Sequence, residues 1–311
     1  MAKVVLCGLG AIGTEIARRL AEHSHEIVGV VDVDPEKAGK TVAELTGLPI
    51  GTRVSASLAE LRGVGAEVAV FATRSRLPEL IADIELAVSL GLHVITTSEE
   101  MAYPWSADSG PADRVDAVAK QKGVTVAGVG VNPGFVMDWV PAVIASAAVD
   151  PTGIHVVRSV DVTRRRRQLQ AKVGVGLSKE RFERGVKQGT LGHVGLAQSV
   201  HLIARSLGSR IEGLKEGVFP ILGSDGYVMG VRQFAEGEAG KCNVRLDLEM
   251  SLTSADFDVV EVKGDPPLKL RFERGVFGDS ATVALVVHAV ERVRGAPRGL
   301  ITVLDLPLTP A

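Results

Sequence analysis

Short apolar runs and helix-spaced apolar residues alternate along the first half of the chain. The apolar runs are 4–7, 27–31, 67–73, 93–97 and 124–129. Between them, 12–20, 80–90 and 111–122 carry apolar residues three or four positions apart, which is the spacing of one helix face. Buried strands that alternate with helices are typical of a doubly wound parallel sheet. The first half of the chain therefore predicts an α/β domain.

The pattern changes after residue 153, where longer segments rich in β-branched residues take over. These segments are 154–162, 244–252, 259–262 and 269–272. Helix spacing follows in 178–188, 194–207 and 281–293, and a final strand-like run covers 300–306. Long strands with helical pieces between them indicate an α+β domain on a mixed or antiparallel sheet.

Together the two patterns predict an α/β fold with an N-terminal Rossmann doubly wound parallel sheet and a second α+β domain. A chain of 311 residues exceeds what one hydrophobic core usually serves, which also favours two domains. We expect the first domain at 1–138 and the second, for substrate and dimerisation, at 139–280. The C-terminal segment 281–311 is expected to return to the first domain.

A glycine motif, Gly8-Leu-Gly10-Ala-Ile-Gly13, lies between the first strand and the first helix. In this setting Gly8 makes the tight turn, Gly10 lets the backbone approach a pyrophosphate, and Gly13 lets helix and strand pack closely. The helix start, with Ala11 and Ile12, then turns its amides and positive dipole end toward the phosphates. We therefore expect a site for a nicotinamide dinucleotide.

The choice between NAD and NADP depends on the residues after the second strand. Asp32 follows Gly13 by 19 residues, close to the roughly 20 expected for the carboxylate that accepts from the adenosine ribose hydroxyls. That charge favours NAD, because it repels a 2′-phosphate. Lys37 and Lys40 lie where the 2′-phosphate of NADP would sit, so use of both cofactors stays open. Pro35 is expected to start a helix here.

Further site residues follow the strands that end at the same edge of the predicted sheet. Ligands bind at the carboxyl ends of strands in such folds, so Ala72, Thr73 and Thr97 join the expected cofactor site. Glu99 and Glu100 come next, and a carboxylate beside the nicotinamide can accept or donate a proton. Burial against neighbouring aromatic residues would raise its pKa toward the working pH.

The segment Asn132-Pro133-Gly134-Phe135 follows the next strand, at the neighbouring side of the expected cleft. Asn132 offers a donor and an acceptor, which suits a carboxamide or a substrate nitrogen. A simple structural turn is the alternative reading of the motif. Phe135 is also expected to line the substrate site.

Three basic residues of the second domain are candidates for substrate contact. Arg164 to Arg167 is the densest charge on the chain, and on a strand its alternate members would face opposite sides. Arg165, or else Arg158, could clamp a substrate carboxylate; a solvated or subunit-facing edge is the alternative for the run. His193 lies in a glycine-rich turn before a helix and could contact substrate or serve as a cap.

Charge and cysteine content indicate which classes of partner and site are not expected. A net charge of −2 gives no electrostatic case for nucleic acid or an anionic membrane. The two cysteines fit a reducing cytoplasm, and no His or Cys spacing suggests a metal site. No apolar run approaches the ~18 residues that span a bilayer.

In their order along the chain, these motifs resemble the 2,4-diaminopentanoate dehydrogenases and native amine dehydrogenases, distant relatives of dihydrodipicolinate reductase. The resemblance extends to Gly189-Thr-Leu-Gly-His193, to Gly278-Asp-Ser-Ala-Thr282 and to the closing segment 297–307. It therefore covers nearly the whole chain.

The resemblance implies reversible oxidative deamination with NAD or NADP. An amine loses hydride to the nicotinamide, and the imine hydrolyses to a ketone and ammonia. The catalytic carboxylate falls on the Glu99–Glu100 pair, with Glu100 preferred and the choice open by one position. Asn132 and Pro133 fall near the nicotinamide and the substrate. The family also implies a homodimer with its interface on the second domain.

Two other functions remain as alternatives. A dihydrodipicolinate reductase-like enzyme that reduces an imine or enamine is less favoured, because the chain lacks a His-His pair followed by lysine and a Ser-Gly-Thr loop. A non-catalytic dinucleotide-binding sensor is the other. Within the amine dehydrogenase reading, an arginine in the cleft would favour an amino acid substrate, and an apolar cleft would favour an alkyl amine.

Overall fold

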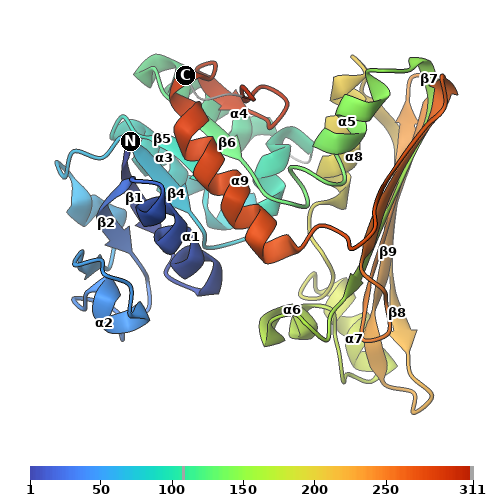
Figure 1. Ribbon diagram of the computed structural model, residues 1–311, viewed down its shortest axis with the longest axis horizontal. Coiled ribbons are helices and arrows are strands. Elements are labelled where there is room, and N and C mark those ends of the chain that lie inside the picture. Colours follow the sequence, from blue (N-terminus) through green and yellow to red (C-terminus); the bar gives the residue numbers. More distant parts are fainter. Residues whose placement is uncertain (107–108, 309–311) are drawn as a thin grey trace. The chain divides into compact units, whose positions relative to one another are not determined.

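Two sheets organise the chain, and each belongs to its own structural unit (Figure 1). The computed structural model describes residues 1–106 and 109–308. Unit 1 comprises residues 1–131 and the chain from 278 onward, and unit 2 comprises residues 132–277. Residues 309–311, the end of the segment expected to return to the first domain, lie outside the described residues.

Unit 1 is built on a seven-stranded sheet with the order β13-β6-β5-β4-β1-β2-β3. Every neighbouring pair is parallel, which confirms the predicted parallel sheet. The strands are β1 (Lys3–Cys7), β2 (Glu26–Val31), β3 (Val54–Ser55), β4 (Val68–Phe71), β5 (His93–Thr96), β6 (Thr125–Gly128) and β13 (Gly299–Ile301).

Helices cover both faces of this sheet. The α-helices are α1 (Ala11–Glu22), α2 (Val42–Thr46), α3 (Ile81–Ser89), α4 (Ser109–Lys122) and α9 (Gly278–Arg292). Short 3-10 helices are η1 (Leu58–Leu61), η2 (Leu77–Glu79), η3 (Glu99–Ala102), η4 (Pro104–Ser106) and η5 (Val293–Gly295). Helices α3 and α4 share a core with the strand residues Val5, Ala69 and Val94, while α1 packs beside α9 (Figure 1).

The prediction of a helix that starts at Pro35 is wrong, because residues 35–39 form turns. The Lys37 amide donates to the Asp34 carbonyl at 3.0 Å, and the Asp34 side chain accepts from the Glu36 amide at 3.0 Å. Aspartate and proline are favoured at the first two positions of such a turn. The same pair also suits a helix start, so the local sequence did not separate the two. Helix α2 begins at Val42.

Unit 2 is built on a six-stranded mixed sheet with the order β12-β11-β7-β10-β9-β8. Only β10 and β7 run parallel, and the other pairs are antiparallel. The strands are β7 (Val149–Asp161), β8 (Ile211–Leu222), β9 (Val228–Ala239), β10 (Cys242–Ser251), β11 (Phe257–Asp265) and β12 (Leu268–Phe272). The expected α+β character of this half is confirmed.

The four helices of unit 2 are α5 (Trp139–Ala145), α6 (Arg167–Lys172), α7 (Lys179–Lys187) and α8 (Leu196–Ser206). Helix α5 packs on β7 and β11, and α8 packs on β8, β9 and β10 (Figure 1). The buried residues Val156, Leu246 and Val260 share the helix-covered face of the sheet. The alternate residues make up the other face, which we call the open face.

The arginine run 164–167 does not form the strand considered for it. Strand β7 ends at Asp161, the chain turns, and α6 begins at Arg167. Arg165 is buried, whereas Arg164 and Arg167 are exposed. The exposure of the four arginines is therefore determined by a turn and not by the alternation of a strand.

One partly buried histidine in unit 1 links folding to pH. The Nδ1 atom of His93, at the start of β5, accepts from the Thr125 amide at 3.1 Å. Burial lowers the pKa of His93 from 6.5 to about 4, with the nearby Arg298 and Arg294 adding to the effect and Glu67 opposing it. The unfolded chain thus takes up a proton near pH 6.5, while the folded protein does so only near pH 4.

We expect the free energy of unfolding to fall as the pH decreases from 6.5 to 4, because the unfolded state binds the additional proton in this window. Replacing His93 with Asn, whose Oδ1 can accept from the Thr125 amide, should flatten part of this decline. Urea denaturation at pH 7, 5.5 and 4.5 measures the effect, with the exposed His23→Asn as the control. An unchanged decline in His93→Asn would contradict this role.

Candidate dinucleotide and substrate sites

The glycine loop between β1 and α1 is closed by backbone contacts at two positions and open at the third. Gly8 has a φ of +96°, and a Cβ there would lie 2.6 Å from the Ala72 carbonyl oxygen. A Cβ at Gly13 would overlap the Gly8 carbonyl oxygen. A Cβ at Gly10 would meet no atom within 4 Å. Two glycines are therefore required by packing, and the third leaves room above the loop.

The start of α1 is suited to an anion. Gly10 is the N-cap, so no side chain occupies the first amides of the helix. The first turn also holds no acidic residue. The first intrahelical hydrogen bond joins the Thr14 amide to the Gly10 carbonyl at 2.8 Å, so the preceding amides, including those of Ala11 and Ile12, lie outside the helical ladder. Helix N-termini of this kind bind phosphates. The loop fits the pyrophosphate of a dinucleotide.

Asp32 follows β2 beside this loop and is mostly buried. Its Oδ2 accepts from the Leu9 amide at 2.8 Å and from Lys37 Nζ at 2.9 Å, and its Oδ1 accepts from the Asp34 amide at 3.0 Å. Burial alone would raise the pKa of this carboxyl, but these hydrogen bonds and the Lys37 charge outweigh it, so the pKa is lowered. Asp32 is thus a fixed carboxylate at the end of β2, where the ribose was expected.

The structure brings Ala72 and Thr73 against the glycine loop. They follow β4, and the Thr73 methyl would lie 2.8 Å from a Cβ at Gly8. Thr97, after β5, donates from its amide to the Phe71 carbonyl at 3.0 Å. These strand ends share the edge of the sheet at which α1 begins.

Glu99 and Glu100 lie on η3, directly after β5, and both are partly buried. The Glu100 carboxylate accepts from the Leu77 amide at 2.8 Å, and its other oxygen lies 3.9 Å from Arg76 Nη1. Its side chain keeps 23% of its surface exposed. Glu100 is therefore held in one orientation while part of it still faces solvent.

In unit 2, the side chain of Asn132 carries an unsatisfied acceptor. Asn132 is 9% exposed, and its Oδ1 has no hydrogen-bond partner within the described part of the chain. Buried acceptors are almost always paired, so this atom is suited to a ligand donor. Phe135 stacks on Trp139 with ring centroids 5.7 Å apart, which gives the segment an apolar wall. Pro133 follows Asn132 through a cis peptide bond.

Asp138 is a polar residue that the sequence interpretation missed. It is fully buried, and it accepts from the Gly134 amide at 2.8 Å, the Trp139 amide at 2.6 Å and Ser199 Oγ at 2.7 Å. Burial raises its pKa although these three hydrogen bonds oppose the shift. Asp138 ties the loop that follows Asn132 to α8. The signal in the sequence that could have identified Asp138 is an acidic residue inside the apolar stretch 135–141.

The two arginines expected near substrate have partners within unit 2. Arg158 is 4% exposed; its Nη1 lies 2.8 Å from Asp258 Oδ1, and its Nη2 donates to the Val276 carbonyl at 2.7 Å. Arg165 lies 3.8 Å above the Phe277 ring and 3.4 Å from Asp256. The geometry therefore makes Arg158 a structural residue and gives no support to its expected contact with substrate.

His193 is positioned by β9. Its amide donates to Gln233 Oε1 at 2.6 Å, and Gln233 Nε2 donates back to the His193 carbonyl at 3.1 Å. This reciprocal pair fixes the glycine-rich turn that precedes α8. The turn and the loop after Asn132 thus both attach to the elements around α8.

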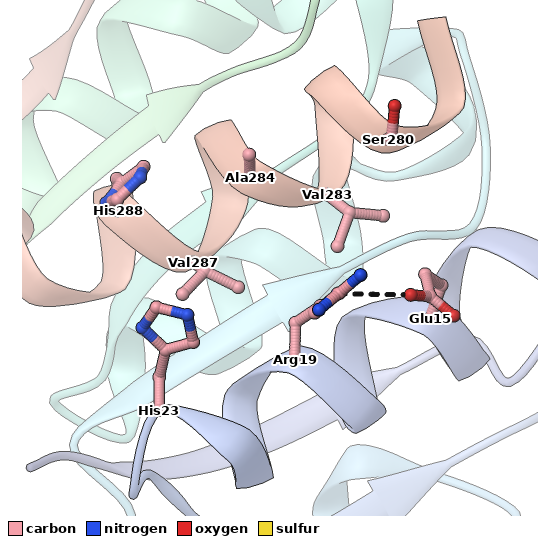
Figure 2. Close-up of a pocket in the computed structure, with 8 residues that line it drawn as sticks. All are labelled: Glu15, Arg19, His23, Ser280, Val283, Ala284, Val287 and His288. Atoms are coloured by element: carbon pink, nitrogen blue, oxygen red, sulfur yellow. Dashed lines mark ion pairs between the residues drawn. The ribbon is translucent and has the colours of Figure 1, made fainter. Parts of the chain in front are cut away.

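A separate pocket of about 240 Å³ lies between α1 and α9 (Figure 2). Val283, Ala284 and Val287 form its apolar side, and the Glu15–Arg19 ion pair, 3.2 Å long, lies at one end. None of the residues considered for the dinucleotide or the substrate lines it. Among the described residues, no cluster of His, Cys, Asp and Glu could hold a metal ion.

The contrast between Gly10 and Gly13 gives a test of the loop. Gly10→Ala should leave the melting temperature of the ligand-free protein unchanged, because its φ of −84° suits alanine and its Cβ meets no protein atom. It should nonetheless raise the Kd for NADH at least about tenfold by filling the space of the pyrophosphate. Gly13→Ala should cost about 1–3 kcal/mol of stability, since the Gly8 carbonyl must move.

Thermal melts and fluorescence titration with NADH measure both effects. Tight NADH binding by a folded Gly10→Ala variant would show that the space above Gly10 is not the pyrophosphate site.

Comparison with known proteins gives a consistent result. Residues 135–311 match the profile of the family described as 2,4-diaminopentanoate dehydrogenase C-terminal domain. The 2,4-diaminopentanoate dehydrogenase of Acetoanaerobium sticklandii is 28% identical over 330 residues, covering 98% of this chain and 93% of that protein.

Solved structures share the fold. The amine dehydrogenase from Mycobacterium smegmatis superposes with a TM-score of 0.89 at 23% identity, covering 98% of this chain and 96% of that one. A Bordetella pertussis dehydrogenase solved with NADH and UDP-GlcNAcA superposes with a TM-score of 0.56 at 14% identity, covering 96% and 77%. The resemblance predicted from the motifs is confirmed. The chain belongs to the 2,4-diaminopentanoate dehydrogenase family.

Proposed function

We propose that this protein is an NAD(P)-dependent amine dehydrogenase. It removes a hydride and a proton from an amine, and the imine hydrolyses to a ketone and ammonia; the reverse direction is reductive amination. Two relatives are named 2,4-diaminopentanoate dehydrogenase and amine dehydrogenase. The observation that carries the proposal is the uncapped start of α1 above the open Gly10, beside a fixed carboxylate at Asp32.

These residues would hold the dinucleotide, which accepts the hydride when bound. The amides at the start of α1 would bind the pyrophosphate, and Asp32 would accept from the adenosine ribose, which favours NAD. Ala72, Thr73 and Thr97 would border the cofactor at the strand ends. Each of these groups is already positioned by contacts within unit 1.

Glu100 is our choice for the group that handles the proton. The Leu77 amide donates to one carboxylate oxygen at 2.8 Å, the other oxygen lies 3.9 Å from Arg76, and the side chain stays 23% exposed. A carboxylate in this position can take a proton from the amine or from the water that attacks the imine. Glu99 is the second candidate on the same turn.

For the substrate we propose contacts from unit 2. Asn132 Oδ1 is a buried acceptor suited to the N–H groups of an amine. The stacked Phe135 and Trp139 favour an apolar substrate body. Arg158 forms an ion pair with Asp258. A plain alkyl amine is therefore better supported as the substrate than an amino acid whose carboxylate would bind Arg158.

We also propose that the protein is a homodimer that pairs through the open face of the unit 2 sheet. This face carries complementary charges close together: Arg245 with Glu236 at 2.6 Å and with Asp247 at 2.8 Å. It also exposes Phe219, which stacks on Phe234 with centroids 6.3 Å apart. Exposed aromatic residues within a polar surface are typical of subunit interfaces.

Both cysteines, Cys7 and Cys242, are free and buried, which favours a reducing compartment such as the cytoplasm. No helix among the described residues is long and apolar enough to cross a membrane.

The proposed role of Glu100 predicts that Glu100→Gln lowers kcat by about 10²- to 10⁴-fold, which is the usual rate contribution of a general acid or base. The Kd for NADH should change little, because the glycine loop is untouched. Oxidation of NADH with ammonia and a panel of small ketones measures turnover, and Glu99→Gln is measured beside it to compare the two candidates. Unchanged turnover in Glu100→Gln would remove Glu100 from the mechanism.

The dimer proposal predicts that Phe219→Glu yields monomers in analytical ultracentrifugation. Phe219 is 53% exposed, so the folded subunit should tolerate the change, whereas a charge within the interface should not be tolerated. Val143→Glu, on α5 and 45% exposed, is the control on the helix-covered side. A dimer that persists in Phe219→Glu would place the interface elsewhere.

A further inference from the structure

Lys37 joins the expected ribose site to the glycine loop. Its Nζ lies 2.9 Å from Asp32 Oδ2, 3.3 Å from the Leu9 carbonyl oxygen and 3.8 Å from Asp34 Oδ2. Its side chain is 26% exposed, while that of Asp32 is 10% exposed. The ammonium is therefore the more accessible member of the pair.

The backbone around Lys37 is fixed in advance. The Lys37 amide donates to the Asp34 carbonyl at 3.0 Å, and the Lys37 carbonyl accepts from the Lys40 amide at 3.1 Å. The Gly39 amide donates to the Val54 carbonyl at 2.8 Å, which attaches the turn to β3. The position of the ammonium is thus set by the two successive turns that replace the helix expected at Pro35.

The charge of Lys37 changes what the carboxylate at Asp32 can exclude. Asp32 alone would repel the 2′-phosphate of NADP, because two anions cannot share a confined site without a counter-charge. With Lys37 in contact at 2.9 Å, the Asp32–Lys37 pair has no net charge, and the second carboxylate near the ammonium, Asp34, is more distant at 3.8 Å. A lysine ammonium carries three donors, and a flexible stem lets it turn toward an added phosphate.

We propose that Lys37 is a specificity-determining residue that lets this site accept NADP as well as NAD. The ammonium stays on Asp32 when the ribose carries a 2′-hydroxyl and pairs with the phosphate when the ribose carries a 2′-phosphate. This inference rests on the proposed function, because it requires a dinucleotide at the glycine loop. It departs from what Asp32 alone predicts, which is a preference for NAD only.

Equilibrium binding tests the proposal without turnover. The Kd values of NADH and NADPH are measured by fluorescence titration, and those of 5′-AMP and adenosine 2′,5′-bisphosphate by calorimetry. The unmodified protein should bind NADPH within tenfold of NADH. In Lys37→Met the ratio of the NADPH Kd to the NADH Kd should rise at least fivefold, and Lys37→Arg should restore the original ratio.

Lys40→Met is the comparison variant, because Lys40 is exposed and is the second lysine expected near the 2′-phosphate. A ratio that changes less than fivefold in Lys37→Met, or equally in Lys40→Met, overturns the role of Lys37. Failure of the unmodified protein to bind NADPH while it binds NADH also overturns it and leaves the proposed function intact. Failure to bind either dinucleotide rejects the proposed function itself.

Discussion

The contact between the backbone of Gly8 and that of Gly13 is the constraint on which unit 1 depends. No side chain fits between them, so α1 can begin directly above the end of β1. This close approach turns the first helical amides toward the open space at Gly10 and brings Ala72 and Thr73 against the loop. Asp32 and Lys37 then attach to the same loop through the Leu9 amide and carbonyl. The shape of the proposed dinucleotide site follows from this one packing requirement.

Unit 2 depends on a different interaction, a buried carboxylate that replaces backbone partners. Asp138 accepts from the loop after Asn132, from the start of α5 and from α8. Gln233 holds the turn at His193 by a reciprocal pair, accepting from the His193 amide and donating to its carbonyl. In both places a polar side chain inside an apolar environment determines where a loop lies. Removing such a partner costs more than removing an exposed hydrogen bond, because the groups left behind remain buried.

Much of unit 1 could be predicted from sequence, because its strands are buried on both faces and its helices are amphipathic. Strands β8 and β9 could not. β8 is the exposed edge of its sheet, and β9 buries Gly230, Ala235 and Gly237, whose small side chains leave no hydrophobic alternation. The glycine loop and Asp32 were recognisable by spacing alone. The partners of Arg158, Lys37 and Asp138 are set by tertiary contacts, which no local pattern contains.

The central claim, that an amine gives up a hydride to a dinucleotide held at the glycine loop, is tested most directly by isotope transfer. The protein is incubated with NAD and a small amine that carries deuterium on the carbon bearing nitrogen, and the cofactor is analysed by mass spectrometry. The account predicts singly deuterated NADH together with the corresponding ketone and ammonia. Ketone formed with unlabelled NADH, or no reduction of NAD or NADP by any amine tested, would contradict it.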